Sequence, residues 1–291
     1  VSDIKRLYGS GRYETSLDIA KKLHDINGNF NHVIIAYGEN FPDALSGGYL
    51  AAQTNAPIII VKNDATVEQN VLNYLHNNAN HCAKIMILGS SSVVSTSFET
   101  KLKKLGMGFN VVRYGGATRF ETNIEILKAG GIETGVNGTL FVASANGFAD
   151  SLSASSSGLP LMIANAELTQ DQITFLNKLK TSGAITDIKI IGSDAAVYQG
   201  VENKLKEIFG NSNVDRLAGK GRYETSAVVA EYVISKYGTP KQVVLAYGEN
   251  FPDGLCGGPV AYALQPGTPL LLINNTDAAI ANVKSDMAQY N

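Results

Sequence analysis

Two arginines that lie six residues apart occur three times in this chain of 291 residues, and they are its clearest candidates for chemistry. The shared pattern is Arg-x-x-Gly-x-x-Arg-aromatic-Glu-Thr, found in RLYGSGRYET, RYGGATRFET and RLAGKGRYET. Guanidinium groups bind phosphate and carboxylate groups through paired hydrogen bonds, so the pattern is compatible with an anion site. The candidate binding residues are these arginines and their aromatic neighbours: Arg6, Arg12, Tyr13, Arg113, Arg119, Phe120, Arg216, Arg222 and Tyr223.

The second arginine of each pair lies beside a predicted helix start, where its positive charge opposes the helix dipole. Two compensating partners are possible. One is an internal carboxylate such as Asp43 or Glu14, and the other is an external anion held by the guanidinium and the helix N–H groups together. The threonines of the pattern, Thr15, Thr122 and Thr225, are candidate helix N-caps. Thr15 and Thr122 also begin a capping-box-like spacing, with an acidic residue three positions later.

A second repeated block follows an apolar strand and precedes a helix. It reads YGENFPDALSGG at 37–48, SANGFADSLSAS at 144–155 and YGENFPDGLCGG at 247–258. The block lacks the lysine of a phosphate-binding P-loop and the glycine spacing of a dinucleotide site.

The aspartates of this block, Asp43, Asp150 and Asp253, are interpreted as helix N-caps, with catalytic carboxylates as the alternative. Glu39 and Glu249 would be natural acid–base partners for them, but the middle copy has Asn146 at that position. Because the pair is lost in one copy, no catalytic residue is predicted.

The composition narrows the function further. A net charge of −2 gives no global attraction to nucleic acid, and no apolar run is long enough to span a bilayer. The four histidines do not have metal-site spacing, and the two cysteines are predicted to be free and buried. No metal or cofactor is therefore predicted.

The repeated blocks define an internal triplication with domain-sized spacing. The second arginines lie 107 and then 103 residues apart, far beyond the period of a solenoid. We therefore expect three modules at residues 1–106, 107–210 and 211–291. The third lacks a counterpart of the KIMILG strand and of the helix after it, so we expect that the chain continues or that another segment completes this sheet.

Within a module, apolar strands alternate with helices. In the first module we predict strands at 4–8, 32–36, 58–61 and 84–88, and helices at 16–26, 43–54, 67–77 and 96–104. Continuous apolar strands separated by helices indicate a parallel sheet covered on both faces. We expect an α/β fold of three small modules that pack around a pseudo-threefold axis.

With these motifs, the whole chain resembles three tandem copies of the cell-wall-binding repeat type 2 family of Gram-positive surface proteins. The resemblance implies a secreted protein of the cell wall or surface layer, held without covalent bonds on an anionic, phosphate-bearing wall polymer. The family's aliphatic triplet falls on 58–60, 161–163 and 270–272, which are expected to be buried strands with an indirect role in anchoring.

Three functions remain to be distinguished. The favoured one is a non-catalytic anchor, in which three weak sites grip a repeating polymer through effective concentration. The second is a carboxylate-dependent hydrolase of wall polymers. The third is a structural tiling module that contacts other surface-layer proteins.

Overall fold

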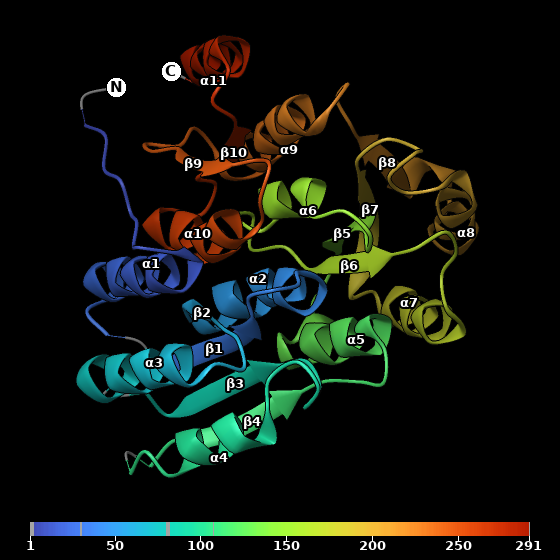
Figure 1. Cartoon of the computed structure of the whole chain (residues 1–291). Coiled ribbons are helices and arrows are strands. Elements are labelled where there is room, and N and C mark those ends of the chain that lie inside the picture. The colour runs from blue at the N-terminus through green and yellow to red at the C-terminus, as the bar shows by residue number, and fades with distance from the viewer. Residues whose placement is uncertain (1–2, 30, 80–81, 107, 291) are drawn as a thin grey trace.

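The structure is a computed structural model, and it describes residues 3–29, 31–79, 82–106 and 108–290. Three α/β modules are arranged in a ring, with the first and third adjacent (Figure 1). Within the described residues, no helix is long and apolar enough to cross a membrane.

The first module contains a parallel sheet with the strand order β2-β1-β3-β4. Its strands are rich in isoleucine and valine, which suit a sheet buried on both faces. The strands are β1 (His32–Tyr37), β2 (Ile58–Val61), β3 (Lys84–Leu88) and β4 (Asn110–Tyr114). The helices are α1 (Arg12–Asn27), α2 (Pro42–Thr54), α3 (Ala65–Asn78) and α4 (Thr96–Lys103).

The second module repeats this architecture with the order β6-β5-β7-β8. Its strands are β5 (Gly138–Ser144), β6 (Leu161–Ala164), β7 (Ile185–Ile191) and β8 (Val214–Leu217). Its helices are α5 (Arg119–Ala129), α6 (Ala149–Ala154), α7 (Gln170–Ser182) and α8 (Gln199–Phe209), with 3₁₀ turns at Ile132–Thr134 and Asn211–Asn213.

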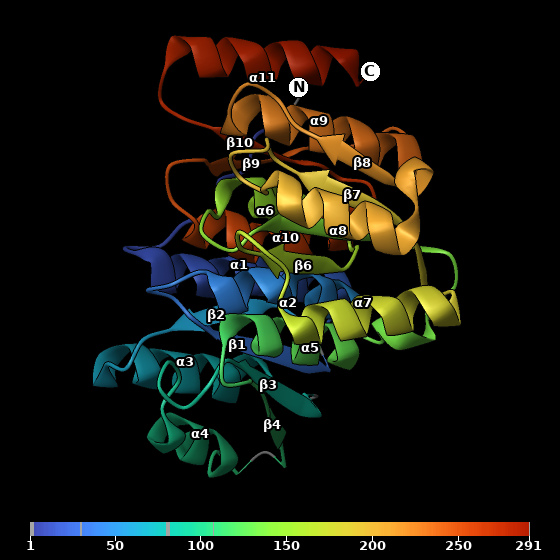
Figure 2. The ribbon, with the colours of Figure 1, turned by 90° about the vertical axis from the view of Figure 1, so that its right-hand side faces the viewer.

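The third module has a sheet of two described strands, β9 (Val244–Tyr247) and β10 (Leu270–Ile273). Its helices are α9 (Arg222–Tyr237), α10 (Pro252–Leu264) and α11 (Asp277–Gln289). Figure 2 shows α11 at the outer end of the molecule, next to α9.

The first strand of each repeat joins the sheet of the module before it. β4 precedes α5 in the second repeat, yet it pairs with β3, and β8 likewise pairs with β7. The predicted strand at 4–8 is wrong, because these residues are neither strand nor helix. They have no neighbouring strand with which to pair among the described residues.

Three phenylalanines mark the pseudo-threefold axis. Phe41, Phe148 and Phe251 are the N-cap residues that precede α2, α6 and α10, and their ring centroids lie 5.8, 5.8 and 6.0 Å apart. Around this axis, α5 packs on α2, α9 on α6 and α1 on α10 (Figure 1). The expected arrangement around a pseudo-threefold axis is therefore confirmed.

The aliphatic triplets lie on the second strand of each module and are buried, as predicted. They support folding by filling the cores beside the axis. Both cysteines, Cys82 and Cys256, are free and buried, which also agrees with the prediction.

Candidate functional site

The second arginine of each pattern is the first residue of a helix that ends at a junction between modules. Arg12, Arg119 and Arg222 begin α1, α5 and α9. Each donates one guanidinium N–H to a backbone carbonyl in the loop that follows β1, β5 or β9, the next strand along the chain. These bonds join Arg12 to Gly38 O at 2.8 Å, Arg119 to Ala145 O at 2.8 Å and Arg222 to Gly248 O at 2.7 Å.

An aspartate of the neighbouring module faces each of these arginines. The positive charge of the arginine lowers the pKa of the facing aspartate in three pairs: Arg119 with Asp43, Arg222 with Asp150 and Arg12 with Asp253. The three pairs run in one direction around the axis. The phenylalanines of the axis also contact the arginines: the guanidinium carbon lies 5.7 Å from the ring centroid for Arg12 over Phe251 and for Arg222 over Phe148.

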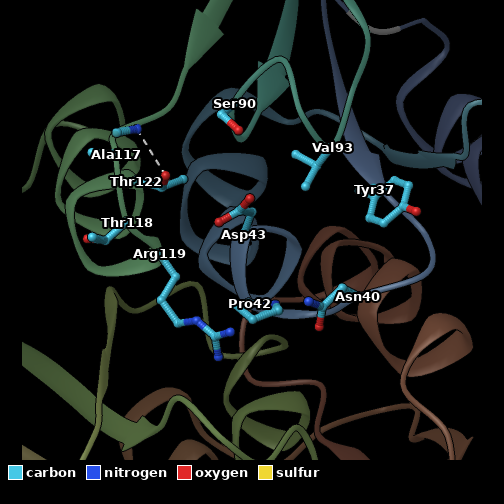
Figure 3. A pocket seen from close by; sticks show the side chains of 11 residues that line it. Tyr37, Asn40, Pro42, Asp43, Ser90, Val93, Ala117, Thr118, Arg119 and Thr122 are labelled. Carbon is cyan, nitrogen blue, oxygen red and sulfur yellow. Dashed lines mark hydrogen bonds between the residues drawn. The ribbon is translucent and has the colours of Figure 1, made fainter.

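A pocket of about 190 Å³ opens at the junction of the first two modules. Figure 3 shows the Asp43 carboxylate inside it, Ser90 near one side, and the Arg119 guanidinium beside Pro42. The two charged groups are not joined by an ion pair within 4.0 Å in the described chain. The Arg119 guanidinium is therefore not neutralised by direct contact with Asp43.

Burial raises the pKa of Asp43, and the positive charge of Arg119 opposes that shift. The same causes act on Asp150 and Asp253, each with its own arginine. A glycine with φ near +95° follows β3 and β7 and makes room for the first two carboxylates. A Cβ on Gly89 would clash with Asp43, and a Cβ on Gly192 would clash with Asp150.

Replacing Asp43 by asparagine is expected to raise the melting temperature at pH 7 and to change it little at pH 3. Because the pKa is raised in the folded state, the stability linked to the protonated carboxyl is present below the ordinary value of 3.8. It is lost as the pH rises through the folded-state pKa. Thermal unfolding of Asp43→Asn between pH 3 and pH 7 measures this, with the exposed Asp194→Asn as control. A lower melting temperature at pH 7 would instead show that Asp43 and Arg119 stabilise each other.

The prediction that Asp43, Asp150 and Asp253 are N-caps is wrong. The N-cap positions are held by the axis phenylalanines, and no side-chain capping bond forms there. The aspartates lie one residue further, after proline or alanine, which turns their carboxylates towards the neighbouring module.

The prediction that Thr15, Thr122 and Thr225 are N-caps is also wrong, because the helices begin earlier than predicted. Their N-caps are Gly11, Thr118 and Gly221. The threonine hydroxyls instead accept hydrogen bonds from the backbone N–H of the glycine that lies three residues after the first arginine. The pairs are Gly9 to Thr15 at 3.0 Å, Gly116 to Thr122 at 3.0 Å and Gly219 to Thr225 at 3.1 Å.

The first arginine of each pattern has a different environment. Arg113 makes two bonds to Glu99, at 3.0 and 2.7 Å, and donates to Gly89 O and Val94 O at 2.8 and 2.9 Å. Arg216 repeats these contacts with Glu202, Gly192 O and Val197 O. With four donors used inside the protein, these two arginines join α4 and α8 to their sheets. Arg6 is exposed.

The aromatic residues lie beside the junction arginines and explain why Glu39 is not repeated. The hydroxyl groups of Tyr13 and Tyr223 donate to Glu39 and Glu249, and burial, with the carboxylate second, raises the pKa of both tyrosines. The middle copy has Phe120, which has no hydroxyl. There Asn146 instead bonds to Asn165 at 2.7 Å, so the glutamate occurs in the two copies that have a tyrosine to bond with it.

Sequence reasoning identified the junction arginines and named Asp43 as a possible partner, but it did not show that each aspartate faces the arginine of the neighbouring module. Ser90, Asn40 and Thr118 also line the first pocket. Asn40 and Thr118 lie within the repeated blocks, but at positions that the three copies do not share. The aspartate that recurs two residues after the axis phenylalanine was the sequence feature that indicated the site. Among the described residues, no group of three or more His, Cys, Asp or Glu side chains could hold a metal ion.

Comparison with known proteins agrees with this repeated architecture. The family model described as "Cell wall binding domain 2 (CWB2)" matches residues 6–99, 113–202 and 216–290. N-acetylmuramoyl-L-alanine amidase LytC of Bacillus subtilis (strain 168) is 25% identical over 263 residues, covering 89% of this chain and 48% of the amidase.

Two solved structures have the same fold. Cwp8 from Clostridium difficile superposes with a TM-score of 0.77 at 28% identity, over 98% of this chain and 51% of that one. Cwp6 from the same organism gives a TM-score of 0.78 at 23% identity, over 97% of this chain and 43% of that one. The chain thus spans about half the length of these relatives. Because the family model covers most of the sequence, the chain belongs to the cell wall binding domain 2 family and is a secreted, cell-wall-associated protein.

Proposed function

We propose that the chain is a non-catalytic anchor that binds an anionic, phosphate-bearing wall polymer at the three junctions between its modules. The observation that carries this proposal is the placement of Arg12, Arg119 and Arg222. Each begins a helix at a junction and donates one hydrogen bond to a loop carbonyl. Arg222 also makes an exposed ion pair with Glu249 at 3.4 Å. The remaining guanidinium N–H groups, together with the free N–H groups at the helix start, can receive an anion.

The guanidinium groups are preorganised for such contacts. The loop carbonyl and, for Arg12 and Arg222, a phenylalanine of the axis restrain the long side chain. An ordered side chain loses less entropy when a ligand binds, which increases affinity. In the proposal, Tyr13, Phe120 and Tyr223 flank these groups, while Arg113 and Arg216 hold α4 and α8 on their sheets and do not contact the polymer. Arg6 is a candidate contact at the third junction.

The ring arrangement accounts for the need for three copies. One arginine in a solvent-exposed pocket gives weak binding, and the chain has no net positive charge to attract a polyanion. Three such sites on one packed body convert the second and third contacts into intramolecular steps. A repeating polymer can satisfy all of them.

We expect the protein to be retained on purified Gram-positive walls and lost from the same walls after acid extraction of their phosphate polymers. Retention on intact walls should fall by about tenfold or more as ionic strength rises from 0.05 to 0.5 M, because salt screens contacts between guanidinium and phosphate groups. Sedimentation of the protein with walls measures both effects.

A neutral glycan on the same support is the control for non-specific adhesion. Equal retention on extracted walls would contradict a phosphate polymer as the ligand. Release of wall fragments during the incubation would support the hydrolase instead. Assembly of the protein without any wall would support the tiling module.

A further inference from the structure

A second pocket, of about 220 Å³, lies at the other end of the second module's sheet from Arg119. Gly138 at the start of β5 and Ile185 at the start of β7 line it. Arg119 instead bonds to Ala145 O, one residue beyond the end of β5. A strand of seven residues spans roughly 20 Å, so this pocket is separate from the junction sites.

All three modules contribute to this pocket, and three tyrosines surround it. Tyr49 comes from α2, Tyr237 from α9 and Tyr262 from α10, while the starts of β5 and β7 belong to the second module. By the repeat, the counterparts of Tyr49 are Ser156 and Pro259. The pseudo-threefold packing therefore does not require a tyrosine at this position, and the triplication does not account for the pocket.

Two of the tyrosine rings lie directly against backbone. A Cβ on Gly158, whose φ is +68°, would lie 2.3 Å from the ring of Tyr262. A Cβ on Gly130 would lie 2.5 Å from the ring of Tyr49. Because the rings are held in place by this close packing, they lose little freedom when a ligand binds against them.

The polar groups of the pocket are available to a ligand. The hydroxyls of Tyr49, Tyr237 and Tyr262 make no hydrogen bond within the described chain, and they are not enclosed. Burial raises the pKa of Tyr49, and it raises the pKa of Tyr237 to about 12, so both hydroxyls are protonated donors at neutral pH. The Gln53 amide makes only a long bond, of 3.4 Å, to Gly158 O.

The ligand that fits these groups is uncharged. Among the described residues that line the pocket, none has a charged side chain. A pyranose ring has faces of C–H groups and a rim of hydroxyls. The faces suit the electron-rich faces of tyrosine rings, and the rim suits free hydroxyl and amide groups. The volume is below the roughly 300–1,000 Å³ of pockets for drug-sized ligands, which favours one ring over a longer chain.

We propose that this tyrosine pocket binds one neutral pyranose ring of a wall saccharide, at a site separate from the arginine junctions. The ring packs against the tyrosine side chains, and its hydroxyls bond to their O–H groups and to Gln53. A single ring in an open pocket gives a Kd of about 1 mM. Binding this weak does not retain the protein on a neutral glycan in a sedimentation experiment.

Saturation-transfer NMR with glucose and with N-acetylglucosamine as probes tests the pocket. We expect at least one of the two sugars to receive saturation from the protein, with a Kd of about 1 mM. Tyr49→Ala and Tyr262→Ala should each weaken this binding about fivefold or more, because each removes a ring face. Tyr198→Ala is the matched control, since Tyr198 is 48% exposed and lies outside the pocket. It should leave binding unchanged.

A second measurement covers alanine variants that fail to fold. In a chain deuterated everywhere except at its tyrosines, saturation of the tyrosine ring protons should still reach the sugar. The transfer should fall in Tyr49→Phe and Tyr262→Phe, because each variant keeps a ring in place but removes its protons from the experiment. Undiminished transfer in both would overturn the proposal, and so would the absence of transfer to either sugar at about 50 mM.

The outcome can be distinguished from that of the proposed function because the probes are uncharged. The triple variant Arg12→Gln, Arg119→Gln and Arg222→Gln should bind the sugar as the parent chain does. Displacement of the sugar by inorganic phosphate would overturn the separate site. Fragments of the wall glycan and of the phosphate polymer are the two competitors that identify the source of the ring. Displacement by neither would overturn a wall saccharide as the ligand.

Discussion

Replacing Phe251 by alanine is expected to lower the free energy of unfolding by about 3 kcal/mol. The side chain is 7% exposed, and its ring packs against Phe41 and Phe148 at centroid distances of 5.8 and 6.0 Å. Each aromatic contact contributes roughly 0.5–1.5 kcal/mol beyond the burial of apolar area. Arg12 also loses the ring over which its guanidinium lies. Because all three modules meet at this ring, the loss weakens every junction.

Urea unfolding followed by circular dichroism measures this effect. Phe109→Ala is the control, since Phe109 is a partly buried phenylalanine of the first module away from the axis. The axis variant should also lower the slope of the transition or split it, because uncoupled modules no longer unfold together. A single steep transition with a loss below about 1 kcal/mol would show that the axis contributes little to the coupling of the modules.

The repeated pattern predicted the alternating elements well because the strands are continuous apolar runs. The helices predicted at 43–54 and 67–77 lie at Pro42–Thr54 and Ala65–Asn78. The helix predicted at 16–26 begins earlier, at Arg12, since Gly11 serves as its N-cap. Helix periodicity indicates the buried face, and it is insensitive to the polar first turn, where the arginine proposed to bind the polymer lies.

The sequence could not reveal which sheet each strand joins. β4 begins the second repeat by its sequence, yet its backbone pairs with β3 of the first module. Local pattern identifies a strand but not its partner, which depends on how the modules pack. The same limit applies to the site, because Asp43 and Arg119 lie 76 positions apart and meet only when two modules form a junction.

The glycine of the arginine pattern shows how packing detail fixes a residue type. A Cβ on Gly9, Gly116 or Gly219 would clash with the glutamate of the same repeat. This glycine therefore allows the chain to fold back closely onto the helix start. The repeated pattern showed that all three copies have this glycine. The structure gives the reason, because the backbone at the glycine lies against the glutamate of the same repeat.

Replacing Arg12, Arg119 and Arg222 by glutamine together is expected to reduce retention on intact walls by about 100-fold or more. Each single replacement should reduce it only a few-fold, because two junctions still hold the polymer. The variants should remain folded, since each one loses one guanidinium bond to a loop carbonyl, which contributes about 1 kcal/mol to stability. Arg222→Gln also loses an exposed ion pair with Glu249 at 3.4 Å, which contributes little. Co-sedimentation with walls and thermal melting, measured on the same samples, separate binding from stability.

Arg113→Gln is the matched control because it removes the other arginine of the same repeat. It removes two bonds to one oxygen of Glu99 and the bonds to Gly89 O and Val94 O. Glu99 keeps Lys103 at 2.7 Å, so the variant should destabilise the fold by about 2 kcal/mol. At a temperature where this variant is folded, its retention should stay close to that of the parent protein. A folded triple variant with undiminished retention would refute the junction arginines as the binding groups. Loss of retention in Arg113→Gln alone would move the polymer site to the outer strands of the sheets.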